Sequence, residues 1–95
     1  MILLETEDYQ LQGQLISGGV LFLHFNYYGE VFTKSTYEKL MDTWAIVLSN
    51  LREQGVKAVA SLIPEEETKI RKFQVMFGLE PHVQVEDKII YRMVL

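Results

Sequence analysis

The order of segments in the last part of the chain constrains the fold most. A strand, a helix and a strand pair are predicted in turn, at residues 56–63, 65–77, 82–85 and 88–95. Pro64 ends the first of these strands, and Gly78 stops the helix because glycine readily adopts a left-handed backbone conformation. Glu86 and Asp87 are expected to form the turn of a closing β-hairpin. Alternating strands and helices of this kind indicate a mixed α/β domain.

The first thirty residues read as strands. Apolar residues alternate with Gln10, Gln12 and Gln14 over residues 9–15, and this period of two predicts a strand with one buried face. A glycine turn at residues 17–19 leads into a nearly continuous apolar run at 20–28. Such a run is typical of a central strand covered on both faces.

Residues 35–54 form the clearest predicted helix, ending at Gly55. Ser35 and Glu38 have the spacing of a capping box, in which each side chain satisfies a free backbone N–H of the first turn. One face carries an apolar stripe at helical spacing, made of Tyr37, Leu40, Met41, Trp44, Val47, Leu48 and Leu51. This stripe, with Trp44 at its middle, is the expected core face of the helix.

Length and composition fit one globular domain spanning residues 1–95, and exclude several classes of protein. The 95 residues contain no cysteine, which excludes disulfides and thiolate metal sites. The net charge of -4 is mild and interspersed, with no basic stripe for nucleic acid. No apolar run reaches the roughly 20 residues that span a bilayer. The residues after Met1 lack a basic region, so we expect no signal peptide and no secretion by that route.

Two short motifs give the chain a resemblance to the GNAT superfamily of acyltransferases. Phe77-Gly78-Leu79 is similar to the stop of that family's second conserved helix, and Tyr91-Arg92-Met93-Val94-Leu95 is similar to its closing strand. The resemblance covers roughly residues 20–95. It implies an α/β (α+β) fold, with a mixed, mostly antiparallel sheet of five or six strands packed against two helices.

The same resemblance shows which functional motifs the chain lacks. GNAT enzymes bind the pyrophosphate of acetyl-CoA on a glycine-rich turn before the long helix, where bare backbone amides meet the anion. The matching residues 33–38 contain no glycine, and Glu38 would repel the anion. The family's general-acid tyrosine falls at Gln74, whose amide cannot donate the proton, and its frequent asparagine falls at Glu67. We therefore expect no cofactor and no catalytic residues.

Other candidate sites are few. His24 and His82 lie on different predicted elements without carboxylates at ligand spacing, so no metal site is expected, and His24 is expected to be a hydrogen-bonded sheet residue. The three glutamates at 65–67 are expected to form a solvated helix start rather than an acid/base pair. Tyr27, Tyr28 and Phe32 lie at the end of the predicted central strand, where they are candidates for a protein interface or for core packing.

The preferred functional hypothesis is a non-catalytic protein-binding domain with an acetyltransferase-like fold. Small GNAT-like domains without the pyrophosphate turn resemble those of tailed bacteriophages, which implies a virion-associated or head-assembly protein in the virion or host cytoplasm. Its partner would be another protein or a second copy, with no role for nucleic acid or membrane. Two alternatives stay open, a divergent acetyl-CoA-dependent N-acyltransferase and a small phage inhibitor of a host defence system.

Overall fold

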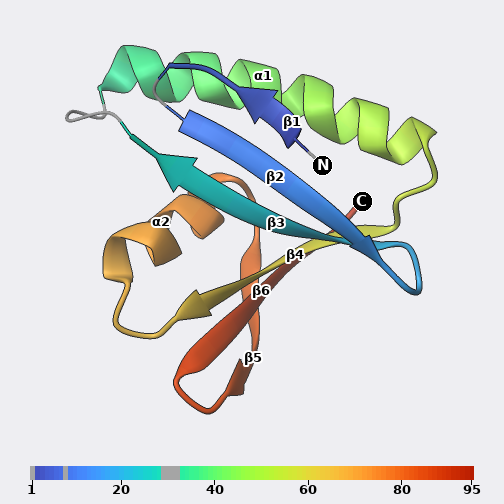
Figure 1. Ribbon diagram of the computed structural model, residues 1–95, viewed down its shortest axis with the longest axis vertical. Coiled ribbons are helices and arrows are strands. Elements are labelled where there is room, and N and C mark those ends of the chain that lie inside the picture. The colour runs from blue at the N-terminus through green and yellow to red at the C-terminus, as the bar shows by residue number, and fades with distance from the viewer. Residues whose placement is uncertain (1, 8, 29–32) are drawn as a thin grey trace.

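The computed structural model describes residues 2–7, 9–28 and 33–95, and these form a single sheet with two helices on one of its faces (Figure 1). The strands are β1 (Ile2–Glu5), β2 (Tyr9–Ile16), β3 (Val20–Tyr27), β4 (Ala58–Pro64), β5 (Glu80–Val85) and β6 (Lys88–Val94). The helices are α1 (Lys34–Glu53) and α2 (Thr68–Met76).

The sheet has six strands in the order β1-β2-β3-β4-β6-β5. Strands β3 and β4 are parallel, as their connection through α1 requires, and the other neighbouring pairs are antiparallel. The predicted fold class, a mixed and mostly antiparallel sheet of five or six strands with two helices, is therefore confirmed. The closing hairpin is also confirmed, and its turn places Glu86 at a positive φ of 57°.

Turn chemistry explains where α1 and the first hairpin end. Gly18 and Gly19 have φ values of 83° and 75°, which the tight turn between β2 and β3 requires. At the end of α1, Gly55 has a φ of 85° and its N–H donates to Arg52 O, while Val56 N–H donates to Leu51 O. These two bonds satisfy carbonyls that the helix leaves free, so the predicted stop at Gly55 is confirmed.

The position of β3 in the sheet is central as predicted, but its expected burial on both faces is wrong. Leu21 and Leu23 on one face are buried, whereas His24 on the other face is exposed and Phe22 is half-buried. Both described helices pack on the first face, so among the described residues no helix covers the second. The nearly continuous apolar run therefore reflects one buried face and one lined with an aromatic ring and polar groups.

Helix α2 begins later than predicted. Residues 65 and 66 form a turn, in which Glu67 N–H donates to Pro64 O and Thr68 N–H donates to Glu66 O, and the helix starts at Thr68. The three glutamates are exposed, as expected, but they precede the helix rather than forming its first turn. The Pro64 carbonyl accepts a turn bond at the point where the sequence pattern predicted the first turn of the helix.

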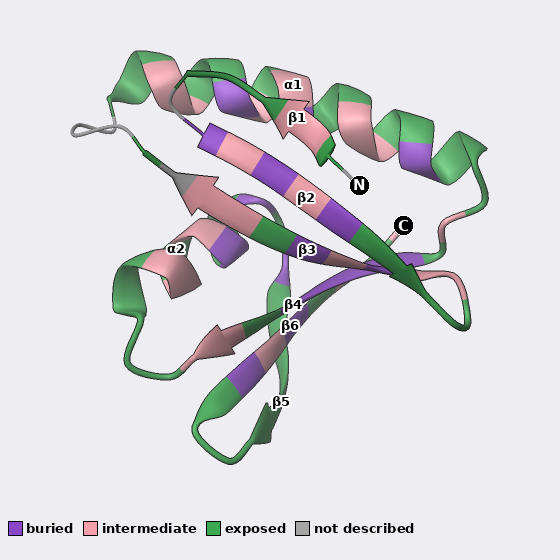
Figure 2. Cartoon of the chain, viewed as in Figure 1, coloured by how far each residue is buried: buried purple, intermediate pink, exposed green. Residues whose placement is uncertain are grey.

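The core lies between the sheet and the two helices, as the buried residues in Figure 2 show. The predicted stripe of α1 is confirmed, since Leu40, Trp44 and Leu51 are buried. Trp44 also joins the two helices, because its indole Nε1–H donates to Phe77 O at 2.8 Å and its ring lies 5.3 Å from that of Phe77. A buried indole needs such a partner, so this bond fixes the relative position of α1 and the end of α2.

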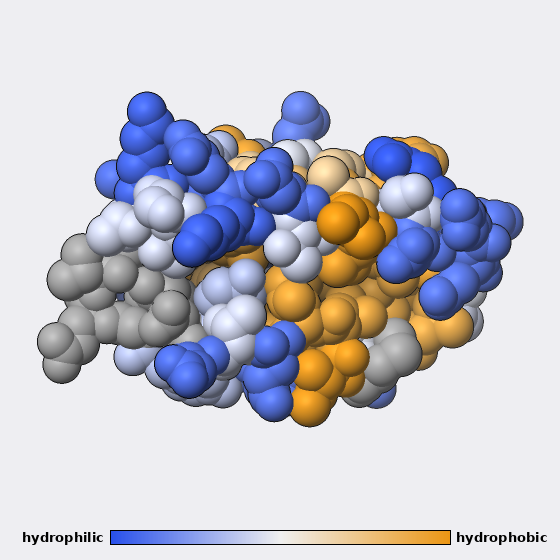
Figure 3. All heavy atoms as spheres, turned by 90° about the horizontal axis from the view of Figure 1, so that it is seen from above, coloured by the Kyte–Doolittle hydropathy of each residue, from blue (hydrophilic) through white to orange (hydrophobic). Residues whose placement is uncertain are grey.

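The surface is uneven. Strand β5 is exposed along its whole length (Figure 2), whereas an apolar area lies open on the side that carries α1 and β1 (Figure 3).

Neither α1 nor α2 combines the length and the apolar character that a helix needs to cross a membrane.

Candidate functional site

The start of α1 is capped by Thr33, the residue that precedes the helix. Thr33 takes the N-cap position with φ -96° and ψ 166°, and its Oγ1 accepts the N–H of Thr36 at 3.2 Å. The predicted capping box of Ser35 and Glu38 is therefore wrong, because Ser35 already lies in the first helical turn. Thr33 adopts the extended backbone of an N-cap residue. From this conformation its side chain can accept the N–H of the residue three positions later.

This geometry differs from that of a known type of diphosphate site. A diphosphate is held by several free N–H groups, usually in a concavity that needs alternating right- and left-handed backbone. Thr33 already occupies the N–H of Thr36, and the exposed side chains of Lys34 and Ser35 stand beside it. Within residues 33–38, which the structure describes, no residue has the positive φ that such a concavity requires.

The middle of the sheet holds a second feature, the parting of β3 from β4. The two strands pair only at Val20–Ala58, Leu21–Val59 and Phe22–Ala60, although both continue. Residues 23–27 of β3 and 61–64 of β4 then diverge, and α2 lies beneath the space between them (Figure 1). We call this gap the split. Its facing backbone edges are not joined by strand pairing, so they are open to another hydrogen-bonding partner.

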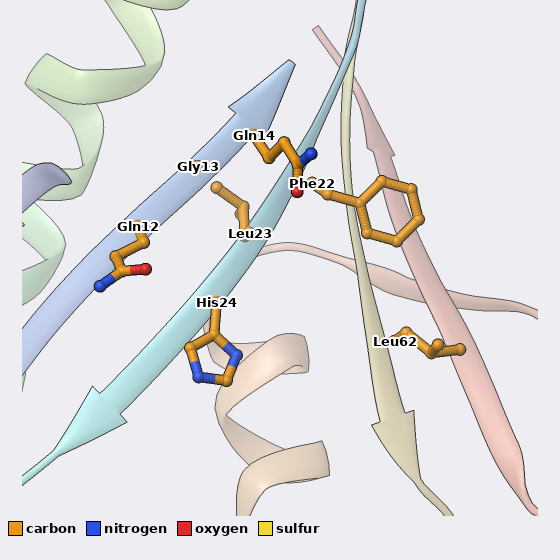
Figure 4. Close-up of a pocket in the computed structure, with 7 residues that line it drawn as sticks. All are labelled: Gln12, Gly13, Gln14, Phe22, Leu23, His24 and Leu62. Carbon is orange, nitrogen blue, oxygen red and sulfur yellow. The ribbon is translucent and has the colours of Figure 1, made fainter. Parts of the chain in front are cut away.

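The split has a cavity on each face of the sheet. On the face without helices a cavity of about 360 Å³ is lined by Gln12, Gly13, Gln14, Phe22, Leu23, His24 and Leu62 (Figure 4). On the helix face a smaller one of about 120 Å³ is lined by Leu11, Leu23, His24, Phe25, Leu62, Ile63, Pro64, Glu67, Ile70, Gln74 and Phe77. Leu23, His24 and Leu62 border both cavities, so the two meet across the split.

An aromatic cluster closes the helix side of the split. The ring of Phe25 on β3 lies 5.4 Å from the rings of both Phe73 and Phe77. Phe73 lies in α2, and Phe77 directly follows that helix. Pairs at this distance contribute about 0.5–1.5 kcal/mol each beyond their buried area. The cluster therefore packs the diverging part of β3 against α2.

The position that corresponds to the general-acid tyrosine of GNAT enzymes is occupied by a buried, hydrogen-bonded amide. Ser61 Oγ donates to Gln74 Oε1 at 2.7 Å, and Gln74 Nε2 donates to Ile70 O at 3.2 Å. Ser61 is 1% exposed and Gln74 3% exposed. Gln74 lines the cavity on the helix face, but an amide held by two hydrogen bonds is a structural group and cannot deliver a proton.

Tyr91 on β6, a phenol near this region in the sequence, is a packing residue. It is 2% exposed, and its hydroxyl accepts a hydrogen bond from Arg71 Nε at 3.0 Å. Arg71 also donates from its Nη1 to Glu65 O at 3.1 Å. Tyr91 borders neither cavity of the split. The pair instead anchors the first turn of α2 to β6.

His24 and Glu67 are the titratable side chains that line the cavities of the split. His24 was expected to be a hydrogen-bonded sheet residue, whereas the structure exposes it on the face opposite Leu23. The sequence pattern could have predicted this exposure, because strand residues two apart share a face. Phe22, His24 and Asn26 therefore lie on the face opposite Leu23. Among the described residues, no group of three or more acidic or histidine side chains is placed to hold a metal ion.

The predicted interface residues can be placed only in part. Tyr28 is 60% exposed just after β3. The backbone of Tyr27 ends that strand, but its side chain and the whole of Phe32 lie outside what the structure describes. The interface at these residues therefore stays a prediction.

Solved structures show what the architecture resembles. The chain is similar to a GNAT-family acetyltransferase from Bacillus anthracis, with a TM-score of 0.70 and 9% identity over 92% of this chain and 58% of that one. It is similar to the GNAT domain of PAT from S. lividans, with a TM-score of 0.73 and 14% identity over 93% of this chain and 54% of that one. The chain has a GNAT-like fold.

A third neighbour is the ribosomal-protein-S18-alanine N-acetyltransferase of Escherichia coli, with a TM-score of 0.64 and 8% identity over 92% of this chain and 61% of that one. The chain thus spans little more than half the length of these structures. No protein-family model matches the sequence, and no curated protein matches it either. At such low identity the likeness establishes the fold, and activity has to be argued from the site.

Proposed function

We propose that this chain is a non-catalytic protein-binding domain built on an acetyltransferase-like fold. The observation that carries the proposal is the hydrogen bond from Thr36 N–H to Thr33 Oγ1, which occupies the helix start where a GNAT-like domain would hold a diphosphate. The engaged amide of Gln74 supports it, since no acid stands at the position from which a thiolate leaving group would be protonated.

Thermal unfolding in the presence of acetyl-CoA tests the absence of cofactor binding. A ligand that binds the folded state raises the melting temperature, so acetyl-CoA at millimolar concentration should leave the melting temperature unchanged. An acetyltransferase with a glycine-rich turn serves as the positive control under the same conditions. A rise of several degrees for this chain would overturn the proposal.

The binding half of the proposal centres on the end of β3. Tyr28 is exposed there, and exposed aromatic side chains are frequent anchors of protein interfaces. A pull-down from native host lysate should recover a partner that Tyr28→Ala or Tyr27→Ala loses. Val94→Ala, at a residue 66% exposed on β6, is the matched control and should retain it. Recovery of no partner, with no difference among the variants, would contradict this surface.

The setting we propose is a tailed bacteriophage, with the protein in the virion or in the host cytoplasm. It rests on the resemblance stated above, and nothing in the geometry adds to it. Mass spectrometry of purified particles should find the chain if it is virion-associated. Capture of a host nuclease in the pull-down would instead favour the inhibitor of a defence system.

A divergent acyltransferase is the second candidate, and the two cavities of the split favour it. His24 and Glu67 line them and are the groups that could exchange a proton there. In that case the chain would transfer an acetyl group to an amine, and His24→Ala or Glu67→Gln would abolish the transfer. Lys72→Ala, on the exposed side of α2, would leave it unchanged.

A further inference from the structure

The alternating glutamines of β2 lie on the face of the sheet without helices. Cross-strand pairing puts two of them beside residues of β3, since Gln12 faces His24 and Gln14 faces Phe22. Leu62 of β4 borders the same hollow, which is the cavity of about 360 Å³ in Figure 4. Neither the core nor the proposed protein interface uses these side chains, so the cavity is free to serve another purpose.

A chain of hydrogen bonds sets the orientation of the Gln12 amide. Glu5 Oε2 accepts a hydrogen bond from Gln10 Nε2, and Gln10 Oε1 accepts one from Gln12 Nε2 at 2.6 Å. A carboxylate can only accept, so the nitrogen of Gln10 faces Glu5 and its oxygen faces Gln12. The nitrogen of Gln12 is thereby used, and its oxygen is turned toward β3, as Figure 4 shows. The cavity thus holds an acceptor that is oriented before a ligand binds.

The other polar side chains of the cavity are exposed and have no partner. Within the described part of the chain, neither Gln14 nor His24 makes a side-chain hydrogen bond. The amide of Gln14 can donate and accept, and an uncharged imidazole offers one donor and one acceptor. Together with the oxygen of Gln12, these groups can both accept hydrogen bonds from one ligand and donate to it.

The remaining side chains make one side of the cavity apolar. The ring of Phe22 is half-buried, and Leu62 is 44% exposed. No lysine, arginine, aspartate or glutamate is among the described residues that line the cavity, so it lacks the cations that usually hold a phosphate or a carboxylate. Its volume lies in the range of small-molecule sites, about 300–1,000 Å³. The lining therefore suits an uncharged ligand with several hydroxyl groups and one apolar face.

We propose that this cavity binds the pyranose ring of a neutral sugar. The C–H groups on one face of the ring pack on Phe22, because the face of an aromatic ring carries partial negative charge. A sugar hydroxyl donates to Gln12 Oε1, and neighbouring hydroxyls exchange hydrogen bonds with Gln14 and His24. Hydroxyl groups both donate and accept, so they can pair with every polar group of this site.

NMR titration of the full chain tests the proposal, with glucose, galactose, mannose and N-acetylglucosamine as probes. At millimolar concentration, at least one sugar should cause saturable shifts of the side-chain amide signals of Gln12 and Gln14 and of the backbone amide of His24. Gln14→Ala, at an exposed position, should weaken this binding about fivefold through the loss of one hydrogen bond. Gln54→Ala, at an exposed glutamine after α1, is the matched control and should leave the affinity unchanged.

Glu5→Gln tests the orienting role of the hydrogen-bond chain. A glutamine at this position can donate as well as accept, so it no longer holds the two amides in one orientation. The affinity for the sugar should fall, while the melting temperature should not change because Glu5 is exposed. An unchanged affinity in Glu5→Gln would overturn the role given to this residue.

Four results would overturn the site itself. One is the absence of saturable shifts with all four sugars, and another is a set of shifts confined to residues outside the cavity. Tighter binding of glucose 6-phosphate than of glucose would show that the site takes an anion. Saturable shifts with adenosine and with none of the sugars would assign the cavity to a nucleobase. Tyr28→Ala, which tests the proposed protein interface, should leave sugar binding unchanged, so the two proposals can fail separately.

Discussion

The start of α1 and the split between β3 and β4 lie in one scaffold but are built by different means. The helix start is made by the side chains of a few exposed residues, and the Thr33 side chain engages one of its backbone donors, the N–H of Thr36. The split is made by strand divergence and by the aromatic cluster of Phe25, Phe73 and Phe77. Packing thus preserves the shape of a GNAT-like sheet, while the hydrogen bonding at the helix start depends on single side chains.

The largest predicted effect on stability comes from Trp44, which supports both regions. Trp44→Ala removes a buried indole that joins α1 to Phe77, and should lower the free energy of unfolding by about 3–5 kcal/mol. Urea unfolding measures it, with Ser49→Ala on the exposed side of α1 as the control. A loss below about 1 kcal/mol would mean that α1 and the end of α2 are not coupled through this residue.

The next effect belongs to the split. Ser61→Ala leaves the buried Gln74 Oε1 without its donor and should cost about 1–3 kcal/mol of unfolding free energy. Removing both partners in Ser61→Ala/Gln74→Leu should cost less than the two single changes added together, because no buried polar atom is then left unpaired. Strict additivity in the double-mutant cycle would show that the two side chains do not interact.

The smallest effect is expected at the helix start. Thr33→Ala removes the cap on Thr36 N–H and should cost about 1 kcal/mol, whereas Thr33→Ser keeps an accepting hydroxyl and should be close to neutral. Thermal unfolding of the two variants measures the difference. Equal stability of Thr33→Ala and the unmodified chain would reassign the cap to another residue.

How far the sequence predicted the structure depends on whether the determinants were local. The period of two in β2, the stripe through Trp44 and the stop at Gly55 depend on neighbours along the chain, and all three predictions are confirmed. The prediction that Ser35 caps α1 was wrong, because Thr33 takes the N-cap position. Both residue types cap well, and Thr33 is the one with the extended backbone from which its hydroxyl accepts the Thr36 N–H.

The candidate site was harder to predict than the fold. The resemblance drew attention to Gln74 and the helix start, but it said nothing of the hydrogen bond between Gln74 and Ser61. The split depends on where the pairing of β3 and β4 ends, at Phe22 and Ala60, and no local pattern encodes that point. His24 was consequently interpreted as an ordinary sheet residue, although it borders both cavities.

The central claim is that the first turn of α1 cannot hold a diphosphate, and NMR tests it at the atom concerned. During titration with acetyl-CoA to millimolar concentration, the backbone amide signals of Lys34, Ser35 and Thr36 should not move. The variant Thr33→Gly lacks the hydroxyl that engages the Thr36 N–H, so it is titrated beside the unmodified chain for comparison. Saturable shifts of these three amides in the unmodified chain would contradict the account.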